Sequence, residues 1–528
     1  MASHSPDVMT IERAQKSFNE AVSLTGYGKY NIFVLLATGG CLMCVIIETM
    51  NMSFIIPAAQ CDLHLTLSEK GILVSISFLG VITTSHFWGF MADYRGRRNI
   101  LILSLITSSI LSIIGSVIPW AWLFILLRYI NGAFIGGASS IIYAFAGEFH
   151  DDYYRPKVIS WVSAFVALGQ MYIPGMAWAI LSQKWEFPVD AFGITFRPWR
   201  LLIIAYALPS LIVAAMMSIL PESPKFLLAK GKHDHTIKIL RKMFVINTGK
   251  NSIEYPVCTV FLDEFVTEQS TEKKTNFFKL IWKQSVLLFK KEFRLKTILI
   301  CYLQFGVFLS ASALALWFPQ ILNSLSKFAQ TVGNANVTLC GSIMNEEVSQ
   351  TKYSKFLLAY KGNFWRSYDS RIDDGEICDD SVDTSVFLVV LLIAVAIMIT
   401  YIVIGIFINK LGKKSILVGG TILTAVSGLV AQYISGFETI LILCGIYLLI
   451  TSMVGVVNAL AVDIYPTNIR AMAIAVSLMF GRLGAMVGSN IVGVIFYSYC
   501  SYIFIFFAIN HLLLVVSTLI LPLKKTKI

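Results

Sequence analysis

The sequence predicts an all-α membrane protein in which twelve transmembrane helices form two six-helix, pseudo-symmetric bundles. Three observations predict this fold. The composition is too apolar for a water-soluble globule, twelve apolar runs are long enough to cross a bilayer, and a polar motif recurs in the two halves of the chain.

Composition alone restricts the class of protein. Of the 528 residues, 56% are hydrophobic and only 14% are charged, whereas a soluble domain carries about 25% charged residues. Mean hydropathy is +0.72. So few charges cannot cover a globule of this size, which excludes a soluble enzyme, a disordered chain and a nucleic-acid-binding protein. The net charge of +11 is explained instead by lysines and arginines that collect in cytoplasmic loops.

The apolar runs set the order of the expected helices. A helix needs about 20 apolar residues to cross the hydrocarbon core. Runs of that kind lie at 32–54, 71–91, 100–118, 121–147, 158–181, 200–220, 297–318, 385–408, 415–434, 439–462, 471–497 and 501–521. We therefore expect the following domains: a cytoplasmic tail (1–31), an N-terminal bundle (32–220), a cytoplasmic linker with interfacial helices (221–296), a C-terminal bundle (297–521) that includes an extracellular or luminal loop (323–384), and a cytoplasmic tail (522–528).

The distribution of charge predicts the topology. Most of the 42 lysines and arginines lie in segments on the same side as the N-terminus, so we expect both termini to be cytoplasmic. The acidic 323–384 loop then faces outward, where Asn336 of an Asn-Val-Thr triplet is a glycosylation acceptor. If that loop faces an oxidising compartment, its Cys340 and Cys378 can pair. Asn51 also begins a matching triplet, but beside a span, and we do not expect it to be modified.

An internal repeat relates the two halves. After the second span, Gly89-x3-Asp93-x2-Gly96-Arg97-Arg98 fits the template Gly-x3-Asp/Asn-x2-Gly-basic-basic. After the eighth, Gly405-x3-Asn409-x2-Gly412-Lys413-Lys414 fits it again. A second pair has the same register: Glu148 precedes Arg155 by seven positions after the fourth span, and Asp463 precedes Arg470 by seven after the tenth. Two matches at nearly one offset predict two related halves, an arrangement common in secondary carriers.

These motifs resemble the major facilitator superfamily, whose signature loop the Gly89 to Arg98 segment matches in full. Asp463-Ile464-Tyr465-Pro466-Thr467-Asn468-Ile469-Arg470 and Pro221-Glu222-Ser223-Pro224-Lys225-Phe226-Leu227-Leu228 resemble motifs of its sugar and organic-ion branches. Gly26-Tyr27-Gly28-Lys29-Tyr30, Glu48, Met176-Ala177-Trp178-Ala179-Ile180 and Trp317-Phe318-Pro319 narrow the resemblance to the synaptic vesicle glycoprotein 2 family and its relatives. The 323–384 loop is much shorter than that family's luminal domain, so neither substrate nor vesicle residence transfers.

The resemblance implies a cytoplasmic gate. In outward-open carriers of this type the Asp93 position contacts the N-terminus of the eleventh span and a nearby arginine. Glu148 with Arg155 and Asp463 with Arg470 would form further charge pairs, which break when the inside opens. The alternative is that Arg97, Arg98 and Lys413 only enforce topology. The expected gate residues are Gly89, Asp93, Gly96, Arg97, Arg98, Glu148, Arg155, Asn409, Gly412, Lys413, Asp463 and Arg470.

Ionisable residues inside spans are candidates for contacting solute, because each costs about 2.5–3.5 kcal/mol on insertion scales. Glu48 can bind a cationic group or a coupling proton, or pair structurally. Arg128 heads a run with Gly132 and Gly136, small residues that permit close helix packing, and a structural role is favoured. Arg482 between two glycines can attract a carboxylate, pair with Glu48 or bind a backbone carbonyl; in organic-ion carriers this position resembles one that influences charge selectivity.

Three further candidates complete the expected site. His86 in the second span can relay protons, although a packing role is the more common one for such a residue. Trp317 and Asn458 could contact an organic solute, although aromatic residues in membrane helices more often pack or anchor the interface. No nucleotide-binding, hydrolytic or metal-ligand pattern appears, so we expect no enzyme activity, cofactor or metal.

The function we expect is a monomeric, multi-pass carrier of a small organic solute, an organic ion or a sugar-like compound. It would work by alternating access in the plasma membrane or an intracellular vesicle membrane, with a proton gradient as one possible energy source. The alternative is a non-transporting receptor or regulator that resembles the vesicle glycoproteins and retains the carrier fold.

Overall fold

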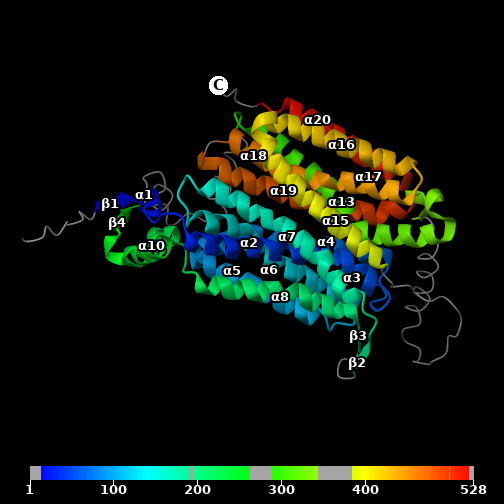
Figure 1. The fold of residues 1–528 in the computed structure, drawn as a ribbon, viewed down its shortest axis with the longest axis horizontal. Helices are drawn as coiled ribbons and strands as arrows, with labels where there is room; N and C mark the ends of the chain where they lie inside the picture. Colours follow the sequence, from blue (N-terminus) through cyan, green and yellow to red (C-terminus); the bar gives the residue numbers. More distant parts are fainter. Residues whose placement is uncertain are drawn as a thin grey trace, which may run out of the picture.

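The fold, taken from a computed structural model, is described for residues 14–189, 194–261, 288, 290–342, 383–465, 467–498 and 500–522. Twelve helices in this part of the chain are long and apolar enough to cross a membrane. They lie side by side in two groups, with the first half of the sequence in one group and the second half in the other (Figure 1). The predicted fold class is therefore confirmed.

Six spans form the first bundle. Its helices are α2 (Lys29–Met50) continued by α3 (Met52–Ala59), α4 (Leu67–Arg95), α5 (Arg97–Gly115), α6 (Ala121–Gly147), α7 (Arg155–Leu181) and α8 (Pro198–Ile219). The predicted close packing at Gly132 and Gly136 of α6 is confirmed. A Cβ on Gly132 would meet the backbone of Ser77 in α4, and one on Gly136 would lie 3.2 Å from the Val81 Cα.

Six spans also form the second bundle. Its helices are α13 (Arg294–Val332), α15 (Thr384–Leu411), α16 (Lys413–Tyr433), α17 (Phe437–Leu448) continued through a 3-10 turn η4 (Leu449–Ser452) into α18 (Met453–Ile464), α19 (Thr467–Ser498) and α20 (Cys500–Ile520). Helix α13 runs well past the expected end of its span at 318. Its extension stays helical because Leu322, Leu325 and Ala329 are buried in the same core as Val337 and Ile440.

Apolar side chains on the outside of the bundles fit a lipid environment. On α15, Leu392 is 59% exposed and Ile406 61% exposed. In water such a surface would drive association, whereas in a bilayer it contacts acyl chains of matching polarity. The chain is therefore a multi-pass membrane protein.

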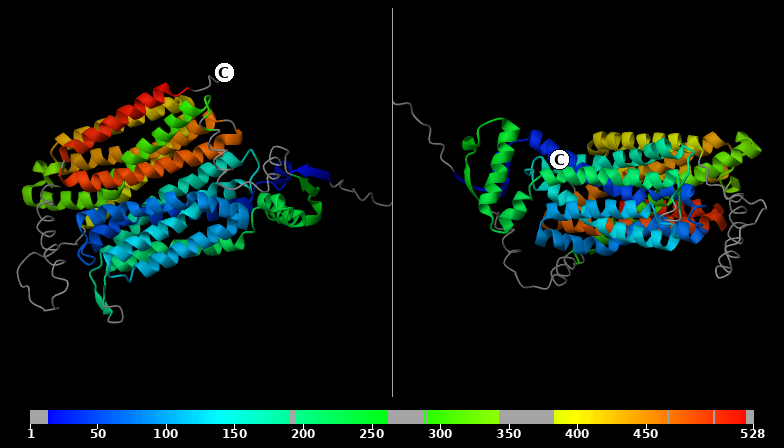
Figure 2. Two further views of the ribbon diagram at one scale, coloured as in Figure 1. Left: turned by 180° about the vertical axis from the view of Figure 1, so that it is seen from behind. Right: turned by 90° about the horizontal axis from the view of Figure 1, so that it is seen from below.

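Smaller elements mark the two ends of the bundles. At one end, here called the terminus end, β1 (Ala14–Ser17), α1 (Phe18–Ser23), α9 (Pro224–Ala229), α10 (His233–Thr248), η2 (Ser252–Glu254) and β4 (Val257–Phe261) are found. At the other, the loop end, lie the hairpin of β2 (Phe187–Val189) and β3 (Ile194–Phe196) and the turn η3 (Asn334–Asn336). Figures 1 and 2 show β1, β4 and α10 projecting beyond the bundles.

At the terminus end, strand β1 pairs in parallel with β4, so Ala14 lies opposite Val257 although more than two hundred residues separate them. The Tyr255 hydroxyl donates to the Ala21 carbonyl over 2.7 Å. Phe18 and Phe244 are buried in the core that the first bundle also shares. The beginning of the chain is therefore fixed to the connection between the two halves.

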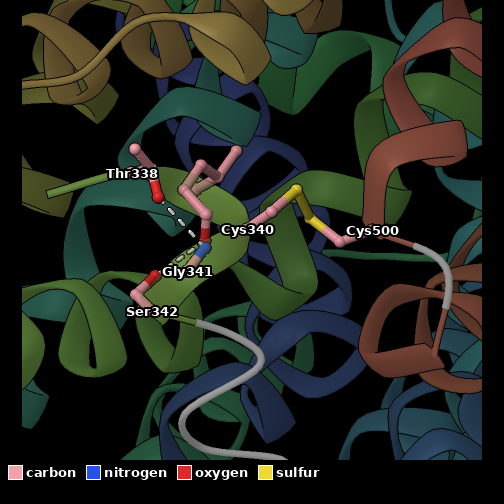
Figure 3. The surroundings of a disulfide bond; sticks show 6 residues. Thr338, Cys340, Gly341, Ser342 and Cys500 are labelled. Carbon is pink, nitrogen blue, oxygen red and sulfur yellow. Dashed lines mark hydrogen bonds between the residues drawn. A yellow bond between two sulfur atoms is a disulfide. The ribbon is translucent and has the colours of Figure 1, made fainter.

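At the loop end, a disulfide joins Cys340 to Cys500 (Figure 3). The expected pairing of Cys340 with Cys378 is therefore wrong for Cys340, and Cys378 lies outside the described residues. Pairing follows proximity in the fold: an isolated bridge between Thr338 and Ser435, with Gly436 N donating to Val337 O over 2.9 Å, holds this segment against the second bundle. The start of α20 is then within reach of Cys340.

Candidate functional site

A buried polar network occupies the centre of the first bundle. Glu48 on α2 and Arg128 on α6 form an ion pair of 3.4 Å with side chains that are 0% and 2% exposed. Ser112 on α5 donates to the same carboxylate oxygen of Glu48 over 2.8 Å. Arg128 also donates to Glu48 O over 2.6 Å and to Asn51 Oδ1 over 2.8 Å. The arginine is held by a carboxylate, a carbonyl and an amide, so this charge is compensated inside one bundle.

Glu48 is therefore not an exposed carboxylate in this conformation. Its second oxygen, Oε1, is buried and has no hydrogen-bond partner among the described residues. Asn131 on α6 extends the network, because its amide donates to Ser112 Oγ and to Ser108 O, each over 2.8 Å. An open acceptor oxygen on a buried carboxylate is the one place in this network where a proton could be added without displacing an existing bond.

Arg482 lies between the bundles. From α19 in the second bundle it donates to Ser85 Oγ on α4 over 3.1 Å and to Ser139 Oγ on α6. Both serines belong to the first bundle. Among the residues that the structure describes, no carboxylate lies within 4.0 Å of its guanidinium. Within the described part of the chain, Arg482 therefore pairs neither with Glu48 nor with a backbone carbonyl, and its hydrogen bonds go to neutral hydroxyl groups.

Two polar side chains of the second bundle lie near Gly481, the residue before Arg482. Gln304 on α13 is buried and donates to Asn458 Oδ1 on α18 over 3.4 Å, and its own Oε1 has no partner within the described residues. Gly481, which precedes Arg482, lets α19 approach closely, since a Cβ there would lie 3.0 Å from Gln304 Cγ. Asn458 is thus hydrogen-bonded to a side chain that packs on Gly481.

The bundles touch at the loop end. Gly71 near the start of α4 faces Gly493 near the end of α19, and a Cβ on Gly493 would lie 3.3 Å from the Gly71 Cα. Trp317 packs against Gly493 and donates to the Ser489 carbonyl over 2.9 Å. Phe54 of the first bundle contacts Phe387 of the second at a ring distance of 5.8 Å. Trp317 is 2% exposed, so it closes the loop end instead of lining an open surface.

The bundles separate toward the terminus end. Gly89 lies one turn beyond Ser85 on α4, and a Cβ there would meet no atom within 4 Å. Asp93, a further turn along, has a side chain that is 72% exposed. His86 and Phe87 are exposed as well. The α4–α19 contact is therefore tight at the loop end and open at the terminus end.

The gate residues form two equivalent clusters at the terminus end. Arg97 pairs with Glu148 over 2.8 Å in the first half, and Lys413 pairs with Asp463 over 2.6 Å in the second. The next basic residue repeats as well. Arg98 Nε donates to the Met217 carbonyl near the end of α8, and Lys414 Nζ to the Leu519 carbonyl near the end of α20. The two halves therefore repeat these ion pairs and hydrogen bonds as well as the sequence motif.

One expected pairing differs. Glu148 contacts Arg97 and Ser223, not Arg155, because Arg155 is turned toward Asp152 over 2.5 Å and Gly147 O over 3.0 Å. Asp93 has a nearby arginine as its partner, as expected, because its carboxylate lies 3.2 Å from Arg97. The side chains of Asn409 and Arg470 lie outside the described residues. Gly96 and Gly412, which join the paired helices, both have positive φ, at 104° and 82°.

Glu222 belongs to this site as well, although its position in the sequence did not predict it. Its carboxylate accepts from Arg97 N over 3.0 Å and from Arg98 N over 3.1 Å, at the N-terminus of α5, where a negative charge is favourable. Burial raises the pKa of the neighbouring Glu148 carboxyl, and the Arg97 charge opposes that rise. Glu222 was part of a quoted motif, but nothing in the sequence placed it at the start of another helix.

Asn336 is exposed at the loop end, whereas Asn51 is fully buried. The exposed Asn336 is therefore accessible for glycosylation and the buried Asn51 is not, as expected. Glycosylation itself stays a prediction. Within the part of the chain that the structure describes, no group of three potential metal ligands is found.

This architecture, with related bundles that meet at one end and part at the other around a polar centre, is that of a transmembrane carrier. The Major Facilitator Superfamily model matches residues 38–344 and 381–528, and the chain belongs to that family. Its relatives there include synaptic vesicle glycoprotein 2B of Homo sapiens, 28% identical over 59% of this chain and 48% of the relative. Synaptic vesicle glycoprotein 2A of Rattus norvegicus is 26% identical over 60% of this chain and 44% of that relative.

The chain spans about half the length of these curated relatives. Solved structures agree on the fold. The xylose transporter XylE from E. coli, in a partially occluded inward-open conformation, has a TM-score of 0.64 at 15% identity, covering 94% of this chain and 99% of that one. The structure of a D-xylose–proton symporter has a TM-score of 0.60 at 14% identity, covering 94% of this chain and 98% of that one. The family assignment, together with the resemblance to the vesicle glycoproteins, is confirmed.

Proposed function

We propose that the chain is a secondary or facilitative carrier that moves a small organic solute with an anionic group by alternating access. The terminus end is assigned to the cytoplasm because of its basic residues, so the conformation described above would be the inward-facing one. The observation that carries the proposal is the position of Arg482, which bridges the bundles without a carboxylate partner among the described residues.

The balance of charges between the bundles favours an anionic group on the solute. The Glu48–Arg128 pair is compensated within one bundle, whereas the hydrogen bonds that Arg482 makes to described residues go to two serines. A cation at this depth costs about 2.5–3.5 kcal/mol on insertion scales, and a carboxylate is the partner that matches the planar guanidinium with two parallel hydrogen bonds. Gln304 and Asn458, on the adjacent wall, supply amide groups for the rest of the solute.

Coupling to protons would rest on Glu48. Adding a proton to Glu48 Oε1, which has no hydrogen-bond partner among the described residues, would neutralise the carboxylate and weaken its hold on Arg128. Because α2 and α6 carry this pair in the same bundle that supplies Ser85 and Ser139, protonation could change how that bundle meets Arg482. This route makes gradient-driven accumulation depend on one carboxyl group.

The experiment is uptake into proteoliposomes that contain the purified full chain. Radiolabelled small carboxylates, organic cations and sugars are compared with and without an inward proton gradient. We expect uptake of carboxylates. Arg482→Gln should lower it roughly 10- to 100-fold, as the loss of hydrogen bonds to a charged group implies. The control is Lys184→Gln, which removes an exposed charge in a loop and should leave uptake unchanged.

Two outcomes would contradict the proposal. If Arg482→Gln takes up carboxylates at the wild-type rate, Arg482 is not the solute contact. If the folded protein takes up no solute of the three classes, the alternative of a receptor or regulator that keeps the carrier fold replaces the transport function.

A further inference from the structure

The β2–β3 hairpin at the loop end has one apolar face. Its opposed pairs, in order from the base, are Phe187 with Phe196, Pro188 with Thr195 and Val189 with Ile194. Directly opposed residues of an antiparallel pair lie on the same face of the sheet, and successive pairs alternate between the two faces. The first and third pairs therefore form a face of four apolar side chains, here called the apolar face, and the second pair lies on the opposite face.

Aromatic rings cluster at the base of this apolar face. Trp185, two residues before β2 begins, stacks on Phe187 with ring centroids 5.3 Å apart and on Phe196 with centroids 6.1 Å apart. Phe187 is nevertheless 59% exposed. The protein therefore leaves much of this aromatic cluster uncovered.

Short connections hold the base of the hairpin close to the membrane boundary. Helix α7 ends at Leu181, four residues before Trp185, and α8 begins at Pro198, two residues after Phe196. Because an extended chain advances about 3.3 Å per residue, the aromatic cluster lies within about 13 Å of the ends of both spans.

The start of α8 is itself fixed to the first bundle. Arg200 is 1% exposed, pairs with Asp62 over 2.8 Å and donates to the Ser116 carbonyl over 2.9 Å. These contacts join α8 to the α3–α4 connection and to the end of α5. The base of the hairpin is therefore held in place by the loop end of the first bundle.

The hairpin extends sideways from the bundle, past α8, instead of lying across its end (Figures 1 and 2). The outer side of α8 is apolar and faces the lipid: Leu208 is 48% exposed and Ile212 63% exposed. The hairpin thus reaches over the lipid beside α8.

Exposed tryptophans mark the membrane boundary at the same end. Trp120 precedes the first residue of α6 and is 57% exposed, and Trp122 in its first turn is 65% exposed. Tryptophan is enriched where the hydrocarbon core meets water, because its ring is apolar and its N–H is polar. The aromatic cluster of the hairpin, next to the ends of α7 and α8, lies in the same boundary region.

We propose that the hairpin is a lipid anchor, with its apolar face on the leaflet at the loop end and the rings of Trp185 and Phe187 among the phospholipids. Docked in this way, it holds the loop ends of α7 and α8 at a fixed depth in the bilayer. The anchor does not require a charged lipid, since the charges at its base, Glu186 and Arg197, pair with each other over 3.5 Å.

The test measures which solvent surrounds each face of the hairpin. The purified full chain, with the exposed Cys258 replaced by serine, is labelled at Phe187→Cys with a nitrobenzoxadiazole fluorophore and placed in phosphatidylcholine nanodiscs. We expect strong quenching by a phosphatidylcholine that carries a spin label near its headgroup, and slow reduction of the label by aqueous dithionite, because an apolar face partitions into the interface.

Pro188→Cys, one residue away on the opposite face, is the matched control. Its label should be quenched several-fold less by the spin-labelled lipid and reduced several-fold faster by dithionite. Val189→Cys lies on the apolar face and keeps Phe187, so it should behave like Phe187→Cys even if loss of the Phe187 ring loosens the hairpin.

Two results would overturn the proposal. If dithionite reduces the labels on both faces equally fast, the hairpin lies in water. If neither dithionite nor the spin-labelled lipid reaches the apolar face, protein covers it, such as a second copy of the chain. Arg482→Gln should leave the quenching pattern unchanged, so failure of the anchor and failure of the transport proposal can be told apart.

Discussion

At the scale of single residues, Arg128 and Arg482, both far from the ends of their helices, have different surroundings. Arg128 is 2% exposed and has a carboxylate, a carbonyl and an amide as partners. Arg482 has two serine hydroxyl groups from the opposite bundle. Removing one member of a buried ion pair leaves the other uncompensated, which is why such changes cost about 3–5 kcal/mol.

Glu48→Gln keeps the shape of the side chain and removes its charge. We expect a clear fall in the thermal stability of the detergent-solubilised protein, of about 3 kcal/mol or more, because Arg128 loses its only ion pair in the described part of the chain. In proteoliposomes the variant should lose accumulation driven by a proton gradient and keep solute exchange at equilibrium.

Glu48→Asp, which retains the charge, is the comparison for that experiment and should recover part of the stability. Normal gradient-driven accumulation in Glu48→Gln would show that this carboxyl group does not carry the coupling proton.

At the scale of elements, equivalent contacts in the two halves differ in how well they are shielded from solvent. The side chains of Arg97 and Glu148 are 18% and 11% exposed, whereas those of Lys413 and Asp463 are 23% and 47% exposed. Exposed ion pairs contribute little, about 0–1 kcal/mol. The two clusters therefore have the same geometry and unequal energetic weight.

A double-mutant cycle measures this difference. Coupling energies from the thermal unfolding of Arg97→Gln, Glu148→Gln and the double variant should exceed those from Lys413→Gln, Asp463→Asn and their double variant. We expect the second coupling to stay below about 1 kcal/mol. Equal coupling in the two cycles would contradict the role of solvent exposure.

The start of α15 depends on one capping residue. Asp383 accepts from Ser385 N over 3.0 Å and from the Ser326 hydroxyl of α13 over 2.6 Å. The Ser326 hydrogen bond lowers the pKa of this carboxyl below its ordinary 3.8. Asp383→Ala should therefore lower the free energy of unfolding by about 1 kcal/mol.

The sign of the pH dependence follows from the direction of that shift. A carboxyl with a lowered pKa contributes stability at any pH above its ordinary 3.8, and that contribution is lost as the pH falls through the lower value in the folded state. The stability difference between wild type and Asp383→Ala should thus be constant near neutral pH and shrink below it. Asp383→Asn keeps an acceptor oxygen but not the charge, so at neutral pH its stability should lie between those of Asp383→Ala and wild type.

At the scale of the whole molecule, the contacts between the bundles define one side as closed. Gly71 touches the second bundle at the loop end, while Gly89 of the same helix faces open space. In a background without the exposed Cys258, Gly89→Cys should react quickly with a maleimide and Gly71→Cys slowly. Saturating solute should reduce the difference, because it lets the bundles exchange between conformations. Equal rates without solute would contradict an inward-facing resting state.

The sequence was sufficient for the spans, their division into two halves and the repeated motif, because a bilayer imposes helix length and polarity directly. It was not sufficient to predict which side chains pair with one another. Glu148, at the end of α6, pairs with Arg97 at the start of α5 and not with Arg155. Cys340 pairs with Cys500, 160 residues away. Likewise, no residue near Arg482 in the sequence predicts that its hydrogen-bond partners are Ser85 and Ser139. Charged residues within spans could be recognised one by one, but their neighbours depend on how helices pack.

The parallel pairing of β1 with β4 has a consequence for synthesis. The chain is made from its N-terminus, and Val257–Phe261 follow all six spans of the first bundle. Residues 14–17 must therefore wait without a strand partner while half of the protein enters the membrane. If synthesis stops before residue 257, the first bundle is released with residues 14–17 lacking their strand partner β4. That unpaired segment distinguishes the unfinished chain from the complete one.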